Sequence, residues 1–80
     1  LEDGQAEVVE LTASGKCRAV NKPLHRMNLP RGALLAAIVH GDDVIIPRGK
    51  DVVHPGDRVI LMTTKEARPT VERLFRPRGE

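Results

Sequence analysis

The stretch from Ala33 to Met62 constrains the fold most, because it holds three short apolar runs separated by turn residues. Two runs, 34–39 and 59–62, are apolar at consecutive positions, which is typical of strands covered on both faces. The third run, 44–46, consists of β-branched residues, which favour a pleated strand. The stretch therefore predicts an antiparallel β-meander.

The residues between these runs indicate particular turn types. Gly41 sits where a two-residue hairpin tolerates positive φ, so the first two runs should pair antiparallel. Pro47-Arg48-Gly49 is typical of a type I turn, and Gly56, third in His54-Pro55-Gly56-Asp57, is typical of type II. The piece between these two turns, residues 51–53, is expected to form a fourth, minor strand.

A first strand is predicted from Ala6 to Ala13, ahead of the meander. Glu7 and Glu10 would lie on opposite faces of it, and charges on both faces are typical of an edge strand. Gly4, just before it, fits the C-cap of a preceding helix. The sequence also begins without methionine. We therefore expect residues 1–80 to be a single domain excised from a longer protein.

One or two helical turns are predicted between this strand and the meander. Asn21 can cap them, Pro23 suits the first turn, and Leu24 and Met27 would share one face. Pro30 ends the helix, and Pro-Arg-Gly at 30–32 predicts another type I turn.

A final helix follows the meander, capped by Thr63 or Thr64. Pro69 either opens the main helix or removes one hydrogen bond from it. The apolar positions recur at helical spacing, at Ala67, Val71, Leu74 and Phe75. The predicted class is a small α+β domain, an antiparallel sheet with a short helix after the first strand and a C-terminal helix, in the order β-α-β-β-β-α.

The helices of this arrangement can cover only one face of the sheet. Because the strands are apolar on both faces, we expect a second copy of the chain to cover the other, giving a homodimer. Phe75 is the only aromatic residue and the net charge is only +2. Modules that stack bases on aromatic rings are thus excluded, and we expect no nucleic-acid partner. No apolar run approaches the roughly 20 residues of a membrane span.

Few side chains suggest chemistry. Cys17 is the only cysteine, so an internal disulfide or a cysteine zinc site is excluded. His25, His40 and His54 lack the close spacing of a metal motif, and we predict no metal site. The carboxylates of the turns, Asp42, Asp43 and Asp57, are those that turns select for backbone hydrogen bonds. With no nucleophile beside a base, we predict no catalytic residues and no enzyme.

A basic group around the short helix is the one candidate binding site. His25, Arg26 and Arg31 could receive an anionic ligand at a dimer seam. Arg48 and Lys50 are interpreted as solvated charges. The alternative interpretation of His25, Arg26 and Arg31 is the same, namely solvated surface charge without a ligand.

The residues carry a resemblance to a known family. The matching features are Leu29-Pro30 with Gly32, the Gly41-Asp42 hairpin, the Gly56-Asp57 turn and the run VERLF at 71–75. With these features the chain resembles the C-terminal domain of the regulator of potassium conductance family, and most closely its TrkA-C group. His40 departs from the family, in which many members have arginine there.

This resemblance implies a cytoplasmic regulatory module of a Trk potassium uptake system, peripheral to the membrane and contacting a TrkH-like membrane subunit. It implies upstream Rossmann-like domains that bind NAD(H) or ATP/ADP, whereas this domain itself would hold no such cofactor. Some family members bind cyclic di-AMP between two such domains. The alternative is the same domain attached to a cation/proton antiporter or a potassium channel.

Overall fold

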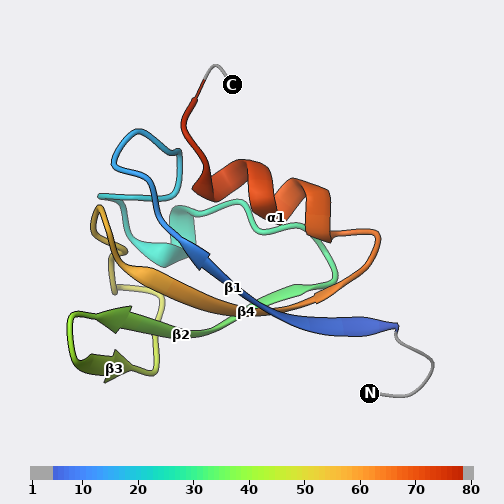
Figure 1. The fold of residues 1–80 in the computed structure, drawn as a ribbon, viewed down its shortest axis with the longest axis horizontal. Coiled ribbons are helices and arrows are strands. Elements are labelled where there is room, and N and C mark those ends of the chain that lie inside the picture. Colours follow the sequence, from blue (N-terminus) through green and yellow to red (C-terminus); the bar gives the residue numbers. More distant parts are fainter. Residues whose placement is uncertain (1–4, 79–80) are drawn as a thin grey trace.

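The computed structural model describes residues 5–78, so the predicted cap at Gly4 lies outside the described part. Four strands form one antiparallel sheet in the order β1-β4-β2-β3. One 3₁₀ turn and one α-helix accompany them (Figure 1). The elements in chain order are β1 (Ala6–Thr12), the 3₁₀ turn η2 (Leu24–Arg26), β2 (Ala33–His40), β3 (Asp43–Ile45), β4 (Arg58–Thr64) and α1 (Arg68–Phe75). The predicted α+β class is confirmed.

The strand order differs from the predicted meander. β2 and β3 form the expected hairpin, with His40 opposite Asp43, but β4 pairs with β2 and β1 instead of β3. The 12 residues between β3 and β4 exceed the two to five of an ordinary hairpin loop. They also form no full strand at 51–53. Val53 and Val52 make only isolated bridges, to Val20 and Pro23.

The predicted helix after the first strand is only the single 3₁₀ turn η2. Asn21 does not cap it; this residue instead takes a left-handed conformation with φ of 65°. The cap position is Pro23, without a side-chain hydrogen bond. The turn at 30–32 also differs from type I, because Gly32 has φ of 94° at the third position, as in type II.

Two local predictions, the edge position of β1 and the opening of α1 at Pro69, agree with the structure. β1 lies at the edge of the sheet, as its charged residues predicted. Pro69 lies in the first turn of α1 and opens the main helix. The predicted cap by Thr63 or Thr64 is wrong, because the N-cap position is Ala67 and no side chain caps the helix. The Thr64 hydroxyl instead accepts a hydrogen bond from the Ala67 amide at 3.1 Å, in the turn just before that helix.

The core fills the space between α1 and one face of the sheet (Figure 1). Alternate residues of β4, at Val59, Leu61 and Thr63, point into it, as the pleat requires. At its margin Glu7 of β1 pairs with Arg68 of α1 at 3.2 Å. The largest fully buried side chains are Phe75, Ile38, Leu61, Val53, Val59, Val71 and Thr63. Within residues 5–78 no helix is long and apolar enough to span a membrane.

Candidate functional site

The second face of the sheet is apolar and exposed. Val8 and Leu34 lie opposite Met62 in the two neighbouring strands, so the three side chains form one row across β1, β4 and β2. Their exposed fractions are 66%, 62% and 40%, respectively. Val44 of β3, opposite Val39, extends the apolar area with 65% exposure. We call this surface the open face.

No described segment covers the open face. In Figure 1, α1 and the loop that contains η2 lie on the same side of the sheet, and the other side is bare. One ion pair, Arg58 with Glu10 at 3.3 Å, stands on this face and is the main polar feature beside the apolar row. The expectation of a second apolar face without cover is confirmed for residues 5–78.

A small pocket lies beside the open face. β3 pairs only with the last three residues of β2, which leaves the first half of the β2 edge free. The pocket, of about 220 Å³, opens against that edge and is walled by residues from the 24–29 and 47–49 segments. Leu34 belongs both to the open face and to the pocket wall. The pocket and the open face therefore adjoin at Leu34.

The predicted anion site is only partly assembled in this pocket. His25 lines it, whereas Arg26 and Arg31 are exposed and outside its wall. The second basic residue in the wall is Arg48, which the sequence suggested was merely solvated. The signal for Arg48 is long-range: the His25 amide donates to the Gly49 carbonyl at 2.9 Å, which brings the 47–49 turn against η2.

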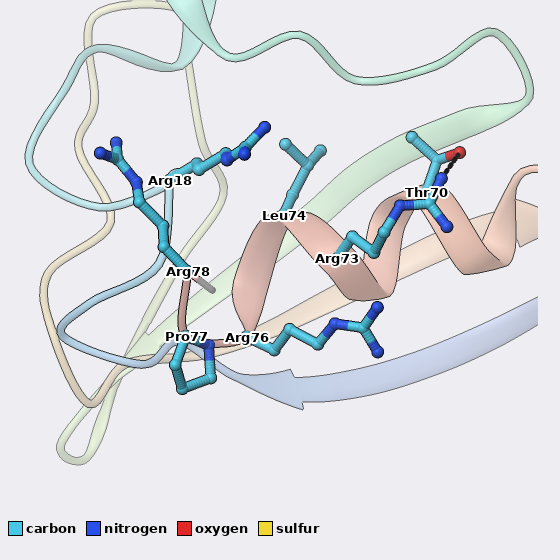
Figure 2. A pocket seen from close by; sticks show the side chains of 7 residues that line it. All are labelled: Arg18, Thr70, Arg73, Leu74, Arg76, Pro77 and Arg78. Atoms are coloured by element: carbon cyan, nitrogen blue, oxygen red, sulfur yellow. Dashed lines mark hydrogen bonds between the residues drawn. The ribbon is translucent and has the colours of Figure 1, made fainter. Parts of the chain in front are cut away.

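An arginine-rich cavity of about 330 Å³ lies at the C-terminal end of α1. Arg73 donates to the Thr70 hydroxyl at 3.1 Å. Figure 2 shows the Arg78 and Arg73 guanidinium groups at opposite ends of the labelled set, so they do not converge on one point. We interpret these arginines as solvated charges.

Two histidines that are distant in sequence meet at the end of the sheet. His40 Nδ1 lies 2.5 Å from Asp57 Oδ1, and His54 Nδ1 lies 3.8 Å from Asp57 Oδ2. The hydrogen bond to Asp57, and then the charge of Asp57, raise the pKa of His40. Sequence spacing does not indicate this cluster, because the 54–57 turn reaches His40 only through the pairing of β4 with β2.

Neither Cys17 nor the hairpin carboxylates form part of a candidate site. The Cys17 thiol is buried in the core with 5% exposure, whereas reactive cysteines are usually partly exposed. Asp42 and Asp43 are exposed in the hairpin turn.

Comparisons with known proteins agree with this architecture. The family model of the TrkA-C domain matches residues 8–76. The chain is 46% identical over 76 residues to Trk system potassium uptake protein TrkA homolog 2 of Methanosarcina mazei, and 32% identical over 81 residues to TrkA of Haemophilus influenzae. These alignments cover 95% and 96% of this chain but only 17% and 18% of the relatives.

A solved structure supplies the same fold. The RCK_C domain dimer of S. agalactiae BusR in complex with c-di-AMP superposes with a TM-score of 0.76 at 20% identity, covering 94% of this chain and 96% of that one. The described sheet, its helix and the sequence match agree, and the chain belongs to the TrkA-C domain family.

Proposed function

We propose that this chain is a dimer-forming regulatory domain of a potassium uptake protein. It has no catalytic role. It acts on the cytoplasmic side, where neighbouring nucleotide-binding domains pass their ligand state through it to a membrane transporter subunit. Relatedness to TrkA proteins over nearly the whole chain supports the Trk system over a cation/proton antiporter.

The observation that carries the dimer is the open face. Four large aliphatic side chains, each exposed by 40% or more, lie on one side of the sheet. Apolar patches of this kind mark association surfaces. A symmetric dimer would bring the two open faces together and remove them from water.

The pocket supports a ligand shared between two copies. Its volume of about 220 Å³ is below the roughly 300–1,000 Å³ typical of a small-molecule site. Two such pockets facing each other across a dimer axis would reach that range. His25 and Arg48 would then supply one basic pair from each chain, which suits a symmetric ligand with two phosphates such as cyclic di-AMP.

Calorimetric titration of the chain with cyclic di-AMP, ATP, ADP and NADH tests this proposal. We expect cyclic di-AMP to bind at one molecule per two chains. Arg48→Ala removes one arginine from each chain of the dimer and should weaken binding by at least about a hundredfold, because each hydrogen bond to a charged group contributes about 1.5–3 kcal/mol. Arg31→Ala, an exposed arginine outside the pocket wall, is the matched control and should bind like the unmodified chain. Equal losses in the two variants would show that only general charge matters.

A further inference from the structure

The cluster of His40, His54 and Asp57 has the geometry of a cation site that the regulatory function does not explain. One nitrogen from each imidazole and one carboxylate oxygen all lie within 4.8 Å of one another. The two imidazole ring centres are 5.6 Å apart. His40 is the last residue of β2, and the other two belong to the turn that leads into β4, so the cluster joins two separate segments.

The turn holds Asp57 rigidly. Its backbone amide donates to the His54 carbonyl at 3.0 Å, and its carbonyl accepts from the Ala13 amide at 2.8 Å. One carboxylate oxygen accepts from the His54 amide at 2.9 Å. The other oxygen faces His40. One potential ligand is therefore fixed in place by the fold before any ion arrives.

The charge of this carboxylate is poorly balanced. Asp57 is only 4% exposed, and buried charges in proteins are normally paired or bound to a metal. Among residues 5–78, no lysine or arginine lies within ion-pair distance of it, and its only ion-pair partners are the two imidazoles, which carry charge only when protonated. A positive ion held between the three side chains would complete this balance.

We propose that His40, His54 and Asp57 bind one divalent transition-metal ion, of the class of Zn²⁺, with the remaining coordination positions open to solvent. Two imidazole nitrogens and one carboxylate oxygen suit Zn²⁺, Co²⁺, Ni²⁺ or Cu²⁺, whereas Mg²⁺ and Ca²⁺ prefer oxygen ligands alone. The ion takes the place of the proton between His40 Nδ1 and Asp57 Oδ1.

The adjustment needed is small. Ligand atoms around a tetrahedral Zn²⁺ with bonds of about 2.0–2.2 Å lie about 3.3–3.6 Å apart. Both imidazoles are 58% exposed, so they can move by the required distance without disturbing the core. A bound ion links the β2–β3 hairpin to the turn before β4, and it stabilises the folded chain because the unfolded chain does not preform the site.

Titration of the untagged chain with Zn²⁺, followed by calorimetry, and with Co²⁺, followed by visible absorption, tests the site. We expect one ion per chain and a visible Co²⁺ band from nitrogen and oxygen ligands. His40→Ala and His54→Ala should each weaken Zn²⁺ binding by at least about tenfold, the lower bound for loss of even an outer partner of a metal site. His25→Ala removes the third histidine, elsewhere in the fold, and should bind Zn²⁺ like the unmodified chain.

Thermal unfolding provides a second measurement, because both substituted imidazoles are exposed and their variants should fold. At the same Zn²⁺ concentration, the Tm should rise for the unmodified chain and for His25→Ala, and rise less for His40→Ala, because weaker binding stabilises the folded chain less; Mg²⁺ should raise none. The proposal is overturned if Zn²⁺ does not saturate a site at millimolar concentration, if His25→Ala loses as much affinity as the other two variants, or if binding persists when His40 and His54 are both replaced.

Discussion

Replacing Leu34 with threonine tests whether the open face forms a dimer. Leu34 is 62% exposed, so the substitution should not disturb the monomer, and threonine suits a strand as well as leucine does. Full burial of a leucine side chain contributes about 1.5–3 kcal/mol. Threonine buries less apolar surface than leucine would. On that scale, the difference for the exposed part of the side chain reduces the favourable free energy of dimerisation by about 1 kcal/mol per chain.

A symmetric dimer contains this residue twice, so the loss should be about 2 kcal/mol, or about a thirtyfold rise in the dimer dissociation constant. Sedimentation equilibrium over a range of protein concentrations measures that constant. Lys65→Thr, an exposed position in the turn before α1, is the control and should leave it unchanged. If Leu34→Thr dimerises as tightly as the unmodified chain, or if the unmodified chain is monomeric at millimolar concentration, the reasoning from the open face is refuted.

Three further predictions concern stability and can be measured by urea unfolding. Phe75→Ala, at 2% exposure, should cost about 3–5 kcal/mol and leave a domain of this size largely unfolded; a loss below about 1 kcal/mol would contradict the assigned core. Gly32→Ala should lower the free energy of unfolding more than Gly41→Ala, although both glycines have positive φ. Only a Cβ at position 32 would meet the Thr64 hydroxyl, at 2.8 Å. Equal losses in the two variants would refute this contact. Arg68→Met removes ion pairs to two carboxylates and should cost about 0.5–1 kcal/mol at low salt but little in about 1 M NaCl, whereas a loss unchanged by salt would indicate packing.

Local patterns predicted local structure well in this chain. The β2–β3 hairpin, the edge position of β1 and the opening of α1 at Pro69 all depend on residues within a few positions of one another. Asn21 shows the limit of such rules: its side chain suits a helix cap, yet the bridge between Val20 and Val53 fixes the backbone there, and the residue takes the left-handed turn instead.

Strand order and the composition of the sites depend on long-range pairing, which no local pattern contains. The insertion of β4 between β1 and β2 aligns Met62 with both Val8 and Leu34, and it also brings Asp57 to His40. Likewise, Arg48 joins His25 in the pocket wall only because the 47–49 turn hydrogen-bonds with η2. Nearness in sequence groups His25 with Arg26 and Arg31, whereas the folded chain places Arg48 beside His25.

The full-length pairing of β1 with β4 limits how this strand can move. All seven residues of β1 have a partner in β4, from Ala6 opposite Thr64 to Thr12 opposite Arg58. Sliding by one position would turn Glu7 away from Arg68 toward the solvent side and push Val8 under the helix, because neighbouring side chains point in opposite directions. A movement of the chain segment before Ala6 should therefore rotate the whole sheet as a rigid body. The face that packs on α1 and the open face would change orientation together.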